Sequence, residues 1–68
     1  MKEVLAKDLK VGDVVYDTEY KLNKFIVSMI CERYMLLSAI ELKLDAYSKE
    51  ENGMYCFSFG ESIWFMED

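Results

Sequence analysis

The 68-residue sequence contains no histidine, the side chain that proteins use most often as a general base and as a metal ligand. Its two cysteines, Cys31 and Cys56, form no CxxC motif and cannot complete a tetrahedral zinc site within one chain. The three glycines are scattered, which excludes a glycine-rich phosphate loop. None of the five serines has a histidine to activate it. The sequence therefore predicts a protein that is not an enzyme and holds neither a metal nor a cofactor.

Basic residues are also scarce. Eight lysine and arginine residues stand against thirteen aspartates and glutamates, which gives a net charge of −5 at pH 7. Residues 1–34 carry six charges of each sign, so the excess lies in residues 35–68, with two basic and seven acidic side chains. Nucleic-acid binding normally needs many basic side chains, and Arg33 is the only arginine. The composition argues against a nucleic-acid partner and favours a basic protein partner, or an acidic surface that only keeps the chain soluble.

Long apolar runs are absent as well, because no stretch approaches the ~20 residues needed to cross a bilayer. Residues 1–10 are charged and lack the apolar stretch of a signal peptide. We therefore expect a cytoplasmic protein without membrane contact, whose reduced cysteines pack as small apolar side chains unless neighbouring strands pair them in a disulfide. The chain is long enough for a single domain, residues 1–68, whose small core leaves apolar surface for a dimer contact or a binding patch.

Alternation of apolar and polar residues is the main pattern that the sequence does contain. Residues 30–47 are rich in helix formers, but their charges scatter around a helical wheel and leave no apolar stripe. At a period of two they divide into two faces, which indicates strands. Strands are predicted over residues 12–17, 24–31, 34–41, 42–48, 54–59 and 62–66, with a bulge where the third meets the fourth.

Residues 24–31 should form a central strand, because both of its faces are largely apolar. Period two places Phe25, Val27 and Met29 together on one face. Residues 32–33 then form a tight connection to the next strand. Before the first strand, the sequence predicts one helical turn at residues 8–9 and a positive φ at Gly12.

Half of the ten aromatic residues lie between positions 54 and 65. Alternation assigns Tyr55, Phe57 and Phe59 to the core, because large apolar side chains dominate protein interiors. After a break at residue 60, Trp64 and Met66 share one face of the last strand. This pair is the candidate exposed contact surface, since tryptophan and methionine are favoured at interface centres. A buried Trp64 is the equally supported alternative.

The stretch DLKVGDVV, residues 8–15, resembles the lead into the first strand of small SH3-like β-barrels. The resemblance implies an all-β fold: an antiparallel barrel of five to six strands with a short N-terminal helical turn. The chain is also similar in size and acidity to small accessory proteins of bacteriophages and other mobile elements. By analogy with SH3-like domains, tyrosines near the strand ends would line a peptide groove, with acidic residues favouring lysine or arginine in the peptide. The candidate protein-binding residues are Trp64, Met66, Tyr16, Tyr20, Tyr47, Glu50, Glu51 and Glu61.

The leading hypothesis for function is a non-enzymatic interaction module that binds a protein with a basic surface. Its narrower form is a phage-encoded acidic inhibitor of a host defence or nucleic-acid-binding protein. One alternative is an oligomer that sequesters a nucleotide by stacking the base on Trp64 or on tyrosine rings. Another alternative is a structural homo-oligomer whose last strand pairs with a second copy.

Overall fold

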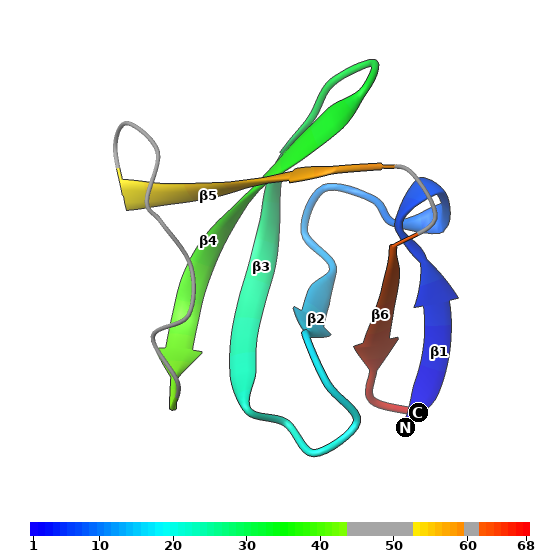
Figure 1. Ribbon diagram of the computed structural model, residues 1–68, viewed down its shortest axis with the longest axis vertical. Coiled ribbons are helices and arrows are strands. Elements are labelled where there is room, and N and C mark those ends of the chain that lie inside the picture. The colour runs from blue at the N-terminus through cyan, green and yellow to red at the C-terminus, as the bar shows by residue number, and fades with distance from the viewer. Residues whose placement is uncertain (44–52, 60–61) are drawn as a thin grey trace.

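The computed structural model describes residues 1–43, 53–59 and 62–68, and these residues form one antiparallel β-sheet (Figure 1). The strands are β1 (Lys2–Leu5), β2 (Val14–Tyr16), β3 (Asn23–Ile30), β4 (Tyr34–Leu42), β5 (Met54–Ser58) and β6 (Ile63–Met66). A short 3-10 turn, η1 (Ala6–Asp8), follows β1. The six strands lie in the order β1-β6-β2-β3-β4-β5. The all-β, antiparallel prediction is confirmed, and residues 34–42 form a strand rather than a helix.

Strand β3 is central, as predicted, because β2 and β4 pair with its two sides. The predicted alternation fails near its end. Val27 pairs with Leu37 and Met29 with Leu36, so β3 contains one extra residue at Ser28. Such a bulge reverses the faces of the residues that follow it. Met29 is therefore 50% exposed, and its predicted place beside Phe25 and Val27 is wrong.

A second irregularity lies near the other end of the β3–β4 pair. Glu41 pairs with Lys24 and Ala39 with Phe25, which leaves Ile40 as the extra residue on β4. The sequence predicts a bulge at this end of the strand, and the shift lies beside the predicted position. The predicted tight connection at residues 32–33 is also present, because the amide of Cys31 donates to the carbonyl of Tyr34 at 2.8 Å.

The core is built around Phe25, a fully buried residue of β3. Its ring meets the rings of Tyr55, Phe57 and Trp64 edge-on, with centroids 5.7, 5.8 and 5.9 Å away. Such T-shaped pairs are the arrangement that aromatic quadrupoles favour. The predicted core set is confirmed, with Tyr55 fully buried and Phe57 and Phe59 half-buried against the cluster. Of the two alternatives for Trp64, burial is confirmed, because its side chain is 4% exposed.

The segment before β2 behaves largely as its sequence suggests. A 3-10 turn forms at Ala6–Asp8, and Leu9 follows it into the core with 5% exposure. Gly12 has a φ of 98°, the left-handed conformation that glycine adopts without strain. The strand before this turn, β1, was not predicted. It pairs with β6 from Lys2↔Met66 to Leu5↔Ile63, a contact between the two ends of the chain.

Figure 1 shows β5 running across the direction of β3 and β6, so the sheet is strongly bent. Among the strand pairings that the structure describes, β1 and β5 are the two ends of the sheet, and none of these pairings closes it into a barrel. No helix in the described part of the chain is long and apolar enough to cross a membrane.

Candidate functional site

Two of the predicted binding residues, Tyr16 of β2 and Met66 of β6, line the same surface depression. Tyr20 lies in the connection between β2 and β3, is 78% exposed and does not line the depression. Trp64 is buried in the core and does not line the depression. Tyr47, Glu50, Glu51 and Glu61 lie outside the described residues, so their predicted role stays a prediction.

The depression has a volume of about 470 Å³ and lies where β6 ends beside the first half of β2. A volume of this size is within the range of small-molecule and side-chain pockets. Its lining residues are Gly12, Asp13, Val14, Tyr16, Lys24, Met66 and Glu67. Val14, Tyr16 and Met66 supply apolar surface, whereas Asp13, Lys24 and Glu67 supply charge. A lining of apolar and charged side chains suits an incoming side chain that has an apolar stem and a charged head.

Strand register explains why Tyr16 sits among charged side chains. Tyr16 pairs with Phe65 on one side and with Lys24 on the other. Phe65 in turn pairs with Glu3, and Lys24 with Glu41. Directly opposed residues in an antiparallel sheet share a face, so these five side chains form one row across five strands on the side away from the core.

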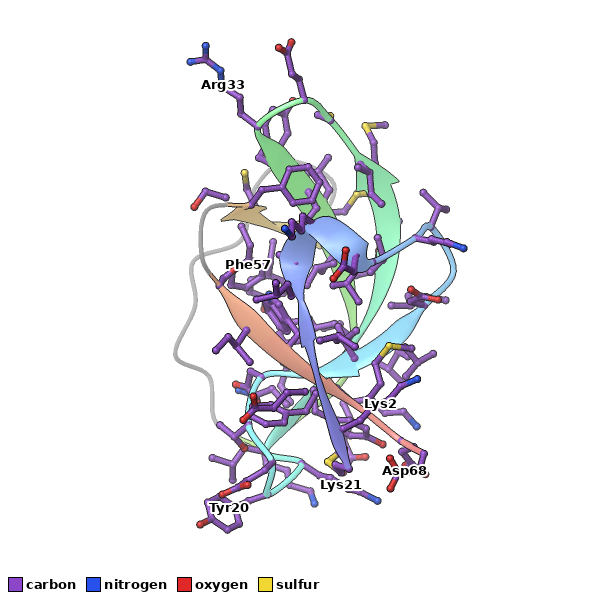
Figure 2. The ribbon with its side chains drawn as sticks, turned by 90° about the vertical axis from the view of Figure 1, so that its right-hand side faces the viewer. Lys2, Tyr20, Lys21, Arg33, Phe57 and Asp68 are labelled. Carbon is purple, nitrogen blue, oxygen red and sulfur yellow. The ribbon has the colours of Figure 1, made fainter. Side chains whose placement is uncertain are left out.

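A hydrogen-bond network joins the chain's C-terminal segment to the β2–β3 connection. The Tyr16 hydroxyl donates to Oε1 of Glu67 at 2.9 Å, and Nζ of Lys21 donates to the same oxygen at 3.2 Å. Nζ of Lys21 and Nζ of Lys24 lie 5.7 and 5.8 Å from the centroid of the Tyr16 ring, within reach of cation–π attraction. Figure 2 shows Lys21 at the same end of the molecule as Tyr20 and Asp68, with Arg33 at the opposite end.

These contacts shift the proton affinity of both acidic groups. The hydrogen bond from Tyr16, together with that from Lys21, holds the pKa of the Glu67 carboxyl below its ordinary value of 4.5. The same bond to Glu67, with partial burial, raises the pKa of Tyr16 above its ordinary value of 10.0. Glu67 is therefore a carboxylate and Tyr16 a neutral donor across the physiological pH range.

Asp13 is fixed by the turn that leads into β2. The amide of Lys10 donates to Oδ2 of Asp13 at 2.8 Å, and the amide of Asp13 donates to the carbonyl of Lys10 at 3.0 Å. In the described part of the chain, no donor reaches Oδ1 of Asp13 or Oε2 of Glu67. Each carboxylate lining the depression thus keeps one acceptor oxygen for an incoming group.

The connection that carries Tyr20 and Lys21 is held rigidly at its base. Asn23 is 1% exposed, and its amide nitrogen Nδ2 donates to Oδ2 of Asp17 at 2.8 Å. Its Oδ1 accepts from the amide of Lys43 at 2.9 Å, which ties the connection to the end of β4. Buried amides are stable only when they are hydrogen-bonded, so Asn23 fixes the geometry of this loop.

The two cysteines do not form the disulfide that the sequence left open. Both are free thiols, and β4 separates β5, which carries Cys56, from the segment that carries Cys31. Cys56 is exposed, so its predicted burial is wrong, whereas Cys31 is half-buried. Hydrogen bonding to Cys31 raises the pKa of Tyr34. Within the ranges that the structure covers, no three cysteine, aspartate or glutamate side chains gather as a metal site would require.

Sequence reasoning did not select the charged residues that surround Tyr16. Asp13, Lys21, Lys24 and Glu67 are not among the candidate binding residues that the sequence predicts. Glu67 could have been found, because it shares its parity with Phe65 and so continues the outer face of the last strand. Nothing local to Lys21 signals its contact with Glu67, since the two are 46 positions apart.

The fold and the depression define a small, bent, antiparallel β-sheet protein with a charged-rimmed surface site. Comparisons of this chain with protein-family models, curated proteins and solved structures gave no match. The functional argument therefore rests on the chemistry of the site.

Proposed function

We propose that this protein is a non-enzymatic interaction module that binds a segment of a basic partner protein in the depression between Tyr16 and Glu67. One observation carries the proposal. Asp13 and Glu67 each keep an unused carboxylate oxygen above the apolar surface of Val14, Tyr16 and Met66. A lysine or arginine side chain complements this arrangement, because its methylene stem packs on apolar surface while its charged head meets carboxylates.

Arginine is the better match of the two. Its guanidinium is planar, presents several donors in a fixed fork and stacks on aromatic faces. Lys24 also lines the depression, but its ammonium lies over the Tyr16 ring and its residue pairs across the sheet with Glu41. The net charge of −5 attracts a basic partner at longer range.

Two narrower statements belong to the same proposal. The buried Leu9 after the 3-10 turn supports an SH3-like barrel arrangement. Inhibition of a host nucleic-acid-binding protein by a phage-encoded protein is one setting in which a small acidic module would meet a basic partner. Tyr20 extends the contact surface in either case.

The two alternatives gain no support from the site. A nucleobase would need an exposed ring for stacking, and the Trp64 side chain is 4% exposed. Self-assembly through the last strand would need a vacant edge, but β6 pairs with β1 on one side and with β2 at Tyr16↔Phe65 on the other.

The test is selection from a library of capped heptapeptides that carry lysine, arginine or glutamate at the centre and random residues on either side. Peptides with a central lysine or arginine should be enriched on the wild-type protein. Glu67→Gln should weaken their binding by about two- to fivefold, the value of one exposed ion pair. Glu32→Gln is the matched control, because it makes the same charge change on the exposed turn between β3 and β4. Equal recovery of basic and acidic peptides would refute the proposal.

A further inference from the structure

The edge of β2 that borders the depression is only partly paired. β2 pairs with β3 along its whole length, from Val14↔Ile26 to Tyr16↔Lys24. Its pairing with β6 on the other side consists of the single pair Tyr16↔Phe65. β6 ends at Met66, so Val14 has no paired strand on that side in the described sheet.

Hydrogen bonds on the β3 side show which way the backbone of Val14 points. The carbonyl of Asp13 accepts from the amide of Val27 at 2.9 Å, and the amide of Asp17 donates to the carbonyl of Asn23 at 3.2 Å. Along a strand, successive residues direct their N–H and C=O groups to opposite sides. The odd-numbered residues of this stretch therefore face β3, and Val14, like Tyr16, directs its backbone groups toward the β6 side and the depression.

An unpaired strand edge is a template for another strand. Val14 offers one backbone donor and one backbone acceptor beside the unused oxygens of Asp13 and Glu67. An extended segment lying there would satisfy the backbone groups. Its alternate side chains would lie on the same side of the sheet as Tyr16, next to the Glu67 carboxylate.

We propose that the partner segment binds as an added β-strand alongside β2 at Val14, with a lysine or arginine directed at Asp13 and Glu67. This inference rests on the proposed function and specifies its binding mode. The occupant is an extended segment of a partner protein. Backbone pairing supplies affinity and the basic side chain supplies selectivity, as in other cases of strand addition.

The charge pattern supports β2 over the end strand β1 as the binding edge. β1 begins with Lys2 and Glu3, and charged residues on an edge strand discourage further pairing. Val14 and Val15 of β2 are apolar, and charge near this edge comes from side chains that face the depression.

The test uses the tightest lysine- or arginine-centred peptide from the heptapeptide library and a set of its variants, each N-methylated at one backbone position. Methylation should weaken binding by about three- to tenfold at the one position whose N–H pairs with the carbonyl of Val14, because Tyr16 already pairs with Phe65 on that side. Methylation at the other positions should be tolerated. The backbone amide of Val14 should exchange more slowly with deuterium when the peptide is bound, whereas that of Arg33, at the opposite end of the molecule, should not change.

The outcomes separate this inference from the proposed function. If the basic peptide binds and Glu67→Gln weakens it, but no single methylated position weakens binding and Val14 exchange is unchanged, strand addition is wrong and the proposed function stands. If the peptide slows deuterium exchange at the backbone amides of Lys2–Leu5 and not at that of Val14, the peptide binds to β1 and the inference is wrong. If no basic peptide binds, the proposed function fails and the inference fails with it.

Discussion

Trp64 changes from a candidate contact residue into part of the core once its neighbours are known. Its ring centroid lies 4.9 Å from that of Phe57 and 5.9 Å from that of Phe25, in T-shaped contacts. Its indole nitrogen is buried, and no acceptor in the described part of the chain reaches it. Sequence alternation correctly separated Trp64 from Ile63, but it could not tell which face is inward, because both faces of β6 are apolar.

Replacing Trp64 with alanine should therefore affect stability rather than recognition. Truncating a buried tryptophan costs about 3–5 kcal/mol of unfolding free energy. The same truncation at Ile63, which is 48% exposed, should cost about 1 kcal/mol or less. Urea denaturation followed by circular dichroism measures both. Failure of Trp64→Ala to fold is the extreme of the expected result, whereas equal stabilities would contradict the burial of Trp64.

The contribution of Glu67 to stability should depend on pH. Hydrogen bonds from Tyr16 and then Lys21 lower the pKa of its carboxyl in the folded state, so the unfolded chain binds the proton more tightly. The stability that this carboxylate contributes is complete above its unfolded pKa and is lost as the pH falls through the lower folded value. Wild type should thus be more stable than Glu67→Gln at pH 7, and the difference should disappear as the pH falls through the lowered pKa of Glu67.

Urea unfolding of the two proteins across this pH range checks the expectation. Glu32→Gln again serves as the control for a charge change elsewhere. A stability difference that stays constant from neutral to acid pH would show that the Tyr16 and Lys21 contacts do not favour the ionised form of Glu67.

At the scale of elements, the strands were predictable where alternation is regular and one face is buried. β4 and β5 follow such patterns. β2, β3 and β6 carry apolar residues on both faces and were predicted from short apolar runs instead. β1 was missed because Lys2, Glu3, Val4 and Leu5 do not alternate, and only Val4 among them packs against the core. The binding depression was not predictable either. It depends on where β6 stops beside β2, which is set by pairing across the whole chain rather than by local sequence.

The bulge at Ser28 makes a second prediction possible, since it places two methionines on opposite faces of the β3–β4 pair. Met35 is fully buried and Met29 is 50% exposed. Met35→Ala should lower the free energy of unfolding by about 2–5 kcal/mol. Met29→Ala should change it by about 1 kcal/mol or less. Urea denaturation of the two variants is the measurement, and comparable losses would mean that β3 keeps regular alternation through Met29.

At the scale of the whole molecule, the position of the depression relative to the core and to the two ends of the molecule matters for its role. The turn between β3 and β4, with Arg33 at its tip, lies at the opposite end from Tyr20, Lys21 and Asp68 (Figure 2). The depression is not at this turn. Val14, Tyr16 and Lys24 of its lining face away from Phe25, whereas Met66 also packs against the core cluster. The core thus supports the site by fixing β2 and β6, and the surface supplies its chemistry.

Association with a basic peptide should depend on salt, because its charged contacts are exposed to solvent. The affinity of wild type should fall as ionic strength rises, since the screening length shrinks from about 10 Å at 0.1 M to about 3 Å at 1 M. Glu67→Gln should show a shallower dependence than wild type. Fluorescence anisotropy with a labelled library peptide gives both curves. If affinity falls equally with ionic strength for the two proteins, Glu67 does not contribute to the binding surface.

The most direct test of the central claim is to map the bound peptide by nuclear magnetic resonance. A lysine- or arginine-centred library peptide is titrated into the isotope-labelled protein, and the backbone amide shifts are followed residue by residue. The account predicts that the largest shifts fall on residues 12–16, Met66 and Glu67, and that residues 31–34 of the opposite turn stay unchanged. Shifts centred on residues 31–34, or spread evenly over the sheet, would contradict a binding site between Tyr16 and Glu67.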